Sequence, residues 1–292
     1  METLTIEEAL KRASFYIRQA GMDQPRLEAE LLLSFCIGKD RLRLRLLQDK
    51  TLNDEKLTFY EEIVNRRCTG EPLAYIIGEK YFFGRSFSVN KNVLIPRPET
   101  EKIIEITISR FRIEGYKKSS KFKCLDLGTG SGVLAVTLAL EFPQGLFWAV
   151  DISKEALETA RCNARRLNVV DRIRFLQSNY FDALQGEKNV KFDLIVSNPP
   201  YIDEKAMNNL PADVKNFEPE IALSGGKEGL DGYRTIIAGL PDHISKPGLL
   251  LLEIGSNQWE AVETICSQAR IFRSIACHND LAGLPRVVEG VV

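Results

Sequence analysis

The stretch "LDLGTGSG" at residues 125–132 decides the fold of this chain. A short apolar run typical of a buried strand is followed by three glycines, Gly128, Gly130 and Gly132, in a G-x-G-x-G pattern. Glycine reaches backbone conformations closed to other residues and lets a ligand approach the main chain closely. A helical pattern, "GVLAVTLALEF", begins at residue 132. The pattern predicts a ligand-binding turn between a strand and a helix, with a spacing other than the G-x-G-x-x-G of pyrophosphate loops.

Strand-like and helix-like segments alternate after this turn. Helical spacing continues in "SKEALETARCNARRLN" (153–168), which Ser153 can cap. The remaining strand-like segments are "LFWAVDIS" (146–153), "RIRFLQSN" (172–179), "FDLIVSN" (192–198) and "LLLLEIG" (249–255). Strands that alternate with helices of this length predict an α/β fold with a mostly parallel sheet covered on both faces. The tail from residue 271 reads as two closing strands, which we expect to be antiparallel.

Asp151 ends the second of these strands. In open α/β folds an acidic residue at this place meets the ribose hydroxyls of a nucleotide-like ligand. A strand-terminal aspartate can also serve only as a helix cap. Because the glycine turn lies one unit earlier on the same sheet edge, we favour the ribose role. The pair predicts a ligand that carries a nucleoside.

The corner "NPPY" at residues 198–201 follows another strand of the series. Prolines fix φ and cannot extend a central strand, so one interpretation is a rigid exit turn. That interpretation does not explain the companions of the prolines. Asn198 offers a side-chain carbonyl, Pro199 a backbone carbonyl, and Tyr201 a flat apolar face beside Pro200. Two acceptors and a flat plate suit a planar NH2 group bonded to a π system.

The first seventy or so residues have helical patterns only. Thr5 and Glu8 form a capping box ahead of a helix that Gly21 ends. A second helix is expected with one face made of Leu27, Leu31 and Phe35, and a third with Leu57, Tyr60 and Val64 aligned. From about residue 74 the period changes to alternation, which predicts a β-hairpin. The expected organisation is a helical domain at 1–73, a hairpin linker at 74–95 and an α/β domain at 96–292, with "KKSSK" (117–121) as a polar connector.

Composition limits the function classes. The net charge of −1 gives no global attraction to nucleic acid or membrane. The six cysteines form no C-x-x-C pair and the two histidines have no ligand-like neighbours, so we expect neither metal nor disulfides. No signal-peptide pattern and no apolar run of about 20 residues is present. These features predict a soluble, cytoplasmic protein without a stable nucleic-acid partner. Separately from these features, we expect a monomer.

The motifs together resemble a known class of enzymes. "DLGTGSG" followed by a strand that ends in Asp151 is similar to the class I S-adenosylmethionine-dependent methyltransferases. The resemblance implies that the turn wraps the methionine part of the cofactor and that Asp151 holds its ribose. Asn179 and Tyr180 match the position at which that class brackets the adenine. Many members have an aspartate where this chain has Asn179, so the charge of that contact is absent here.

The resemblance extends over residues 5 to 290 to one family, the bacterial release factor glutamine methyltransferases (HemK/PrmC). It is carried by "EAELLLSFCIG", "GEPLAYIIGEKYFFGRSFSVNKNVLIPRPETE", "NPPY", "EPEIALSGGKEGLDGYR" and "LAGLPRVVEG". It implies a Rossmann-like domain with a mostly parallel seven-stranded sheet, joined by a β-hairpin to a small helical bundle that recognises the substrate. It also implies N5-methylation of the glutamine in the Gly-Gly-Gln loop of class I peptide chain release factors. The cofactor would be S-adenosylmethionine and its product S-adenosylhomocysteine.

The resemblance implies two sets of site residues. The catalytic set is Asn198, Pro199, Pro200 and Tyr201. The cofactor-binding set is Gly128, Thr129, Gly130, Ser131, Gly132, Asp151, Tyr180 and Asn198. Arg97 and Glu99 in "LIPRPETE" either flank the pocket or make a structural salt bridge or helix cap.

Two other functions compete with this reading. A nucleic-acid adenine-N6 or guanine-N2 methyltransferase would share the corner and its chemistry, but the neutral charge and the lack of a nucleic-acid module count against it. In a non-catalytic or NAD-binding Rossmann protein the glycine spacing would be unusual, and the Asn-Pro-Pro-Tyr corner would have no purpose.

Overall fold

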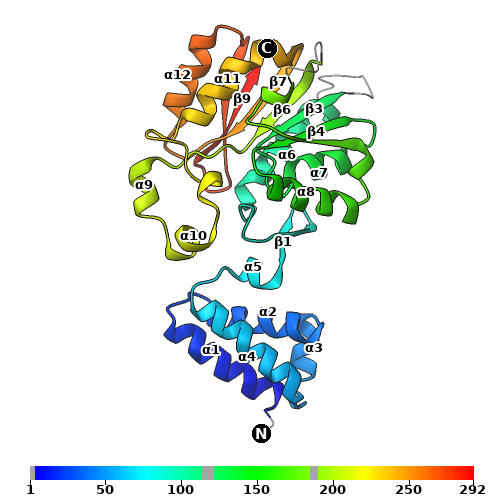
Figure 1. The fold of residues 1–292 in the computed structure, drawn as a ribbon, viewed down its shortest axis with the longest axis vertical. Coiled ribbons are helices and arrows are strands. Elements are labelled where there is room, and N and C mark those ends of the chain that lie inside the picture. Colours follow the sequence, from blue (N-terminus) through cyan, green and yellow to red (C-terminus); the bar gives the residue numbers. More distant parts are fainter. Residues whose placement is uncertain (1–3, 114–121, 185–189) are drawn as a thin grey trace. The chain divides into compact units, whose positions relative to one another are not determined.

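The computed structural model describes residues 4–113, 122–184 and 190–292 (Figure 1). The connector at 117–121 lies outside these residues. The chain divides into two compact units, Met1–Glu79 with Pro211–Phe217, and Lys80–Leu210 with Glu218–Val292. No helix in the described ranges is both long and apolar enough to cross a membrane.

The first unit is helical, and its core joins α1, α2 and α4. Its helices are α1 (Ile6–Gln19), α2 (Pro25–Ile37), α3 (Arg41–Leu46), α4 (Asp54–Cys68), α5 (Leu73–Ile77) and α10 (Ala212–Phe217). The expected capping box is confirmed: Glu8 N–H donates to Thr5 Oγ1, and the Thr5 N–H donates back to the Glu8 carboxylate at 2.8 Å. This reciprocal pair fixes where the first helix begins.

The expected buried face of α2 is wrong. Leu32 and Leu33 are fully buried, whereas Phe35 is exposed and Leu27 and Leu31 are only partly covered. Because α2 packs against both α1 and α4, its buried stripe is set by two neighbours and does not follow one set of i, i+4 positions.

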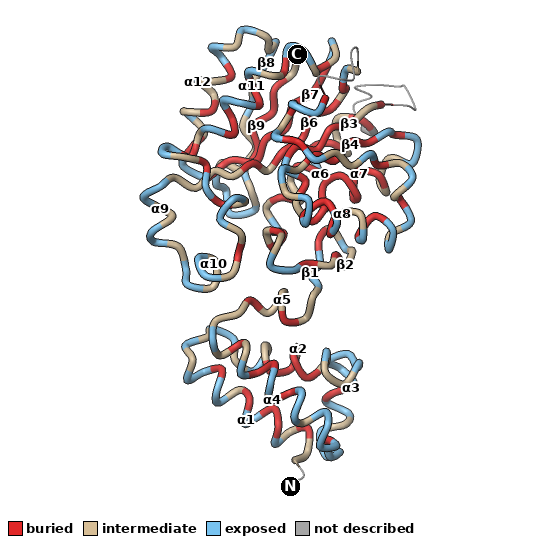
Figure 2. The backbone as a smooth tube through the Cα atoms, viewed as in Figure 1, coloured by how far each residue is buried: buried red, intermediate tan, exposed pale blue. Residues whose placement is uncertain are grey.

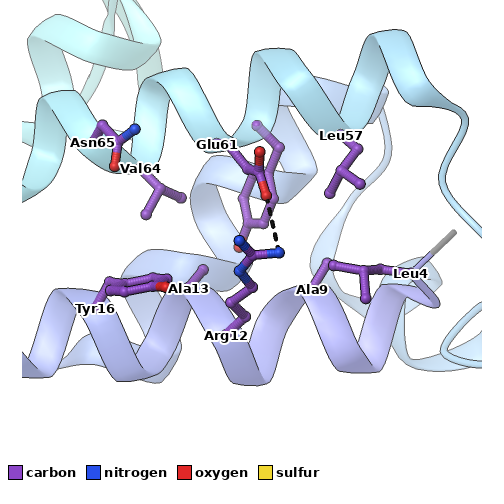
Figure 3. A pocket seen from close by; sticks show the side chains of 10 residues that line it. Leu4, Ala9, Arg12, Ala13, Tyr16, Leu57, Glu61, Val64 and Asn65 are labelled. Carbon is purple, nitrogen blue, oxygen red and sulfur yellow. Dashed lines mark ion pairs between the residues drawn. The ribbon is translucent and has the colours of Figure 1, made fainter. Parts of the chain in front are cut away.

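A small cavity of about 160 Å³ lies between α1 and α4 (Figure 3). The ion pair from Arg12 Nη1 to Glu61 Oε1, 3.3 Å long, crosses it. Its remaining lining is mostly apolar, with Leu4, Leu57 and Tyr16 among the side chains. All of the lining residues belong to the helical unit.

A two-stranded sheet follows, made of β1 (Glu79–Phe82) and β2 (Arg85–Ser88). The turn residues Phe83 and Gly84 both have positive φ, 48° and 71°, as the tight hairpin turns that match strand twist require. The hairpin is shorter than the alternating sequence suggests, because residues 73–77 form the helix α5.

The second unit is a seven-stranded, mostly parallel sheet in the order β5-β4-β3-β6-β7-β9-β8. The strands are β3 (Lys123–Leu127), β4 (Leu146–Asp151), β5 (Ile173–Gln177), β6 (Phe192–Ser197), β7 (Ile244–Glu253), β8 (Ser274–Asn279) and β9 (Pro285–Val291). β9 runs antiparallel to both of its neighbours, β7 and β8, so the two closing strands are antiparallel to each other, as expected from the tail. The predicted Rossmann-like fold, with its helical N-terminal region and hairpin, is confirmed.

Helices cover both faces of this sheet (Figures 1 and 2). The main ones are α6 (Glu101–Ile108), α7 (Val133–Glu141), α8 (Lys154–Arg166), α11 (Asp231–His243) and α12 (Trp259–Ala269), and α9 (Glu204–Asn208) is a short addition. Apolar residues of α6, α7 and α8 join one core cluster with Leu249 and Leu251 of β7. Residues of α11 and α12 join the other with Leu250 and Leu252. Neighbouring strand residues face opposite cores, which is why β7 is apolar at every position from 249 to 252.

Candidate active site

The parallel strands bring five carboxyl ends to one edge of the sheet. Leu127 pairs with Val150 on one side and Ser197 on the other, and Ser197 pairs with Leu252. From β3 the chain adds strands first outward through β4 and β5, then on the opposite side through β6 and β7. Ligands of open α/β folds bind at such a switch point, beyond the carboxyl ends of the strands.

Asp126 fixes the glycine turn after β3 through two hydrogen bonds. The carboxylate oxygen Oδ2 of Asp126 accepts from Thr129 Oγ1 at 2.6 Å and from Ala135 N–H at 3.1 Å. Gly128 and Gly130 have φ of 70° and 55°, and a Cβ added to either would meet no atom within 4 Å. Their main chain therefore faces open space, which a bound ligand can approach.

Asp126 is itself buried, and its other oxygen, Oδ1, lacks a hydrogen-bond partner among the described residues. Burial raises the pKa of Asp126 to about 7, against the hydrogen bonds from Thr129 and Ala135, which lower it. A buried acceptor without a donor costs free energy unless a ligand or water satisfies it. Asp126 is thus a second acidic group at this edge, next to the turn that the sequence motif defines.

Asp151 at the end of β4 joins the turn to the next helix. Its Oδ2 accepts from Gly130 N–H at 2.8 Å, and its Oδ1 accepts from Ser153 N–H at 2.9 Å. Ser153 caps α8 by accepting from Ala156 N–H, as expected. Burial raises the pKa of Asp151, against the lowering effect of these main-chain donors. The carboxylate therefore organises two loops and still lines the cavity described below.

Tyr180, after β5, has an unusual backbone conformation, with φ of 47°. Non-glycine residues in this region carry local strain that is typical of functional sites. Burial raises the pKa of its phenol to about 12, so the ring is neutral at physiological pH. A Cβ added to Gly232 would lie 2.7 Å from Tyr180 Oη and 3.1 Å from Pro199 Cβ, so the ring and the proline corner meet at this glycine.

The Asn-Pro-Pro-Tyr corner follows β6 directly. Ser197 anchors the strand end through its hydroxyl, which donates to the Leu127 carbonyl at 2.6 Å. Asn198 is half-buried, and its Nδ2 donates to Thr100 Oγ1 at 3.3 Å. Among the described residues, no donor of the chain reaches Asn198 Oδ1 or the Pro199 carbonyl. Both acceptors proposed from the sequence are therefore free of intrachain hydrogen bonds.

A cavity of about 290 Å³ collects most of the predicted residues. Those that line it are Gly128, Thr129, Gly130, Ser131, Asp151, Asn179, Tyr180, Asn198 and Pro200. Gly132, Pro199 and Tyr201 are not part of its lining. Gly132 instead begins α7 with φ of 83° and packs against Ala160, where a Cβ would lie 3.0 Å from the Ala160 Cβ. Gly132 therefore allows α7 to pack closely against α8.

Arg97 makes a structural ion pair. Its Nη2 lies 2.6 Å from Glu218 Oε1, and the buried Glu218 also accepts from Ile95 N–H. Neither Arg97 nor Glu99 is in the lining of the cavity. The salt-bridge interpretation of Arg97 fits this geometry.

The sequence did not reveal Gln258, the side chain that holds the Asn-Pro-Pro-Tyr corner in place. Gln258 donates from Nε2 to the carbonyls of Tyr201 and Gly229, and its Oε1 accepts from Gly255 N–H and Tyr233 Oη. It thereby ties the corner to the glycine-rich segment at 225–232, whose residues Gly225, Asp231 and Gly232 line the cavity. The density of glycines in "SGGKEGLDG" was the available signal; nothing local marks Gln258.

Neither histidine belongs to the cavity. His243 stacks on Phe181 with ring centroids 4.4 Å apart, and His278 pairs with Glu289 at 3.1 Å. Within the described ranges no group of three or more His, Cys, Asp or Glu residues could hold a metal ion. The polar groups of the cavity are thus carboxylates, amides, hydroxyls and main-chain atoms.

The sheet, the glycine turn and the cavity at the switch point define a methyltransferase of the class I, Rossmann-like type. The fold is similar to the crystal structure of the hMettl16 catalytic domain in complex with the MAT2A 3'UTR hairpin 6, with a TM-score of 0.56, 15% identity and coverage of 84% of this chain and 85% of that chain. It is also similar to the N-terminal domain of human METTL16 in complex with SAH, with a TM-score of 0.52, 19% identity and coverage of 71% and 76%.

Sequence comparison is more specific. Residues 8–78 match the PrmC N-terminal domain and residues 108–214 the methyltransferase small domain. The chain is 39% identical to a release factor glutamine methyltransferase of Koribacter versatilis over 98% of both chains. It is 41% identical to one of Neisseria gonorrhoeae over 91% of this chain and 93% of that protein. The chain belongs to the release factor glutamine methyltransferase family.

Proposed function

We propose that this methyltransferase transfers a methyl group from S-adenosylmethionine to the N5 nitrogen of the glutamine in the Gly-Gly-Gln motif of class I peptide chain release factors. One observation carries the proposal: Asn198 and Pro200 of the corner line the same cavity as the glycine turn and Asp151. The names of the relatives support the choice of a glutamine in a release factor. The reaction modulates translation termination.

The residues of the cavity fit the cofactor. Gly128 and Gly130 face open space, so the turn admits a ligand against its main chain. Asp151 offers a carboxylate to ribose hydroxyls, and Tyr180 offers a neutral ring to an adenine. Bound S-adenosylmethionine supplies a methyl group on a positively charged sulfur. The proposed cofactor set is Gly128, Thr129, Gly130, Ser131, Gly132, Asp151, Tyr180 and Asn198.

The corner selects and aims the nitrogen that receives the methyl group. Asn198 Oδ1 and the Pro199 carbonyl each accept one N–H of the substrate amide, while Pro200 and Tyr201 shape the slot around its plane. Holding both N–H bonds favours a pyramidal nitrogen, whose lone pair is otherwise delocalised into the amide. Positioning of this kind supplies several kcal/mol, about 7–11 in favourable models. No side chain needs to remove a proton beforehand, because the N–H becomes acidic as nitrogen gains the methyl.

The proposal also covers the organisation and setting of the protein. Residues 1–73 form a substrate-recognition domain, residues 74–95 a linker and residues 96–292 the catalytic domain. The helical domain binds the release factor outside its Gly-Gly-Gln loop. The enzyme acts in the cytoplasm as a monomer, with no stable nucleic-acid partner.

The test is mass spectrometry of a release factor after incubation with enzyme and S-adenosylmethionine. We expect a 14-Da increase on the peptide that contains Gly-Gly-Gln, and none when that glutamine is replaced by alanine. Parallel incubations with DNA and ribosomal RNA should give no labelled product. Equal labelling of the alanine variant, or salt-sensitive labelling of nucleic acid alone, would contradict the proposal.

A further inference from the structure

Two exposed apolar side chains lie in segments that carry the family resemblance, and neither has a role in the function proposed above. Ile221 belongs to the 3-10 helix Glu220–Ala222, which follows the Asn-Pro-Pro-Tyr corner along the chain, and is 56% exposed. Leu281 belongs to the turn at 280–284 between β8 and β9 and is fully exposed. Single exposed apolar residues are common on protein surfaces, so their position decides whether these two have a function.

The turn at 280–284 lies at the same edge of the sheet as the corner. β9 pairs with β7 so that Val287 lies opposite Glu253, the last residue of β7, and Ile254 N–H donates to the Arg286 carbonyl at 2.9 Å. The turn that precedes β9 therefore projects beyond the carboxyl end of β7. β7 lies between β9 and β6, the strand that ends at the corner. Two strand spacings separate β9 from β6, a distance of about 10 Å.

Hydrogen bonds fix the shape of this turn. Asp280 Oδ1 accepts from the main-chain N–H groups of Ala282 and Leu284 at 2.9 and 3.0 Å. The Asp280 N–H donates to the Leu284 carbonyl at 2.8 Å, and Arg286 Nη2 donates to Asp280 Oδ2 at 3.1 Å. Because the backbone around Leu281 is already ordered, little conformational entropy is lost when this side chain binds a partner.

Ile221 connects the same edge to the cavity. Its side chain lines the cavity together with Asn198, although more than half of the residue is exposed. Its segment is tied to the residue after the corner, since Ile202 N–H donates to the Leu223 carbonyl at 3.0 Å and Gly225 N–H donates to the Ile202 carbonyl at 2.9 Å. Ile221 is therefore in contact with both the cavity and solvent, and forms part of the rim of the cavity.

A protein substrate must cross this rim. The glutamine side chain has to enter the cavity, whereas the residues before and after it remain attached at Cα steps of about 3.8 Å. An extended chain advances about 3.3 Å per residue, so the distance from β6 to β9 corresponds to about three residues. A substrate segment that runs across the end of β7, with its glutamine at Asn198, thus brings a residue about three positions away to Leu281.

We infer that Ile221 and Leu281 form an apolar rim that binds the release-factor segment on one side of the methylated glutamine, with an apolar side chain of that segment against Leu281. The inference rests on the proposed function, because that function makes a release factor the substrate. It gives the catalytic domain its own share of substrate recognition, in addition to that of the helical domain. Leu281 contacts the polypeptide and not the reacting nitrogen, so it contributes to substrate affinity and not to the chemical step.

The experiment compares serine substitutions at two exposed leucines. Leu281→Ser removes the apolar contact at the rim. Leu146→Ser makes the same change at the opposite end of the sheet, where Leu146 begins β4 and is 45% exposed. Calorimetry measures binding of a release factor to each enzyme saturated with S-adenosylhomocysteine.

We expect Leu281→Ser and Ile221→Ser to raise the Kd for the release factor about 10-fold, which corresponds to an interface residue that contributes about 1.4 kcal/mol. Leu146→Ser should leave this Kd unchanged. Leu281→Met keeps the size and apolar character of the side chain and should retain most of the affinity. The Kd for S-adenosylhomocysteine should be the same in Leu281→Ser as in the unmodified enzyme.

Steady-state methylation of the release factor gives a second readout. Leu281→Ser should raise KM about 10-fold with little change in kcat, because the lost contact is made equally in the ground state and the transition state. An unchanged Kd and KM in Leu281→Ser, or an equal rise in Leu146→Ser, overturns the inference. Weaker binding of S-adenosylhomocysteine to Leu281→Ser also overturns it, since the turn would then belong to the cofactor site.

The two readouts separate this inference from the proposed function. If the unmodified enzyme binds the release factor without methylating it, the proposed function is refuted, while weaker binding by Leu281→Ser still supports the rim. Methylation by the unmodified enzyme with an unchanged KM in Leu281→Ser refutes the inference and leaves the proposed function standing. Absence of both binding and methylation refutes both.

Discussion

The main-chain N–H of Gly130 donates to Asp151 Oδ2 at 2.8 Å, which joins the turn after β3 to the end of β4. This hydrogen bond makes the carboxylate of Asp151 responsible for the shape of the turn, in addition to its proposed contact with the ribose of the cofactor. Asp151→Ala should weaken binding of S-adenosylmethionine about 10- to 100-fold, because hydrogen bonds to a charged acceptor contribute about 1.5–3 kcal/mol. Isothermal titration calorimetry measures the change, and Asp171→Ala, at an exposed position of the 3-10 helix Val170–Arg172, is the control. Equal affinity in both variants would contradict the role of Asp151.

Asn198→Ala should act on the chemical step more than on cofactor binding. The lost acceptor matters most as the substrate nitrogen becomes pyramidal, so the single-turnover rate should fall by at least about 100-fold, the order seen when a stabilising donor or acceptor of a transition state is removed. The dissociation constant for S-adenosylhomocysteine should change by much less. A parallel loss of cofactor affinity would place Asn198 in the cofactor site only.

Gly232→Ala tests the close approach between α11, Tyr180 and Pro199. The added methyl would lie 2.7 Å from Tyr180 Oη, so the ring must shift. Alanine also favours the helix by about 1 kcal/mol, which offsets the strain in overall stability. We therefore expect weaker cofactor binding with little change in Tm, and no effect of Asp242→Ala on the exposed end of the same helix. A drop in Tm without a change in affinity would mean that Tyr180 is only a packing residue.

Gln258→Glu should destabilise the fold around the corner. The change removes both donors that hold the carbonyls of Tyr201 and Gly229, and directs a carboxylate oxygen at them. Leaving such buried groups unpaired costs about 1–3 kcal/mol, and a charge adds to this. Thermal unfolding at pH 8 provides the measurement. Gln177→Glu makes the same chemical change at an exposed position, and a comparable loss of Tm there would refute the assignment.

Asp126 should make stability dependent on pH. Its folded-state pKa of about 7 lies above the ordinary value of 3.8, so the unfolded chain releases this proton first. The contribution of Asp126 to the free energy of unfolding is therefore fully present below pH 3.8 and is lost as the pH rises from there through about 7, by up to about 4 kcal/mol in total.

Urea denaturation of the unliganded enzyme and of Asp126→Asn from pH 5 to pH 8 tests this. The stability of Asp126→Asn should increase relative to the unmodified enzyme across the range. A constant difference between the two would show that Asp126 has an ordinary pKa in the folded protein.

Local sequence patterns were enough to predict the elements that carry the motifs of the proposed cofactor site. The turn at Gly128, the strand end at Asp151 and the cap at Ser153 are each defined by a few adjacent residues, and each lies where expected. The spacing of apolar residues and the alternation of strands with helices also predicted the parallel sheet and the antiparallel strands at its end. Local patterns gave a wrong prediction for α2, where packing against two other helices leaves Phe35 exposed. They also gave a wrong prediction at 73–77, where residues with a strand-like alternation form a short helix.

By itself the sequence determined the type of fold, the family and the corner that holds the acceptors, because these depend on local motifs and on the order in which the motifs follow one another along the chain. Only the tertiary structure decided which side chains stand behind that corner. Thr100 and Gln258 come from distant segments, and no period or motif links them to Asn198 or Tyr201, to which they are hydrogen-bonded. They reach the corner because the chain folds these segments onto the edge where the parallel strands end, and burial there strengthens their hydrogen bonds.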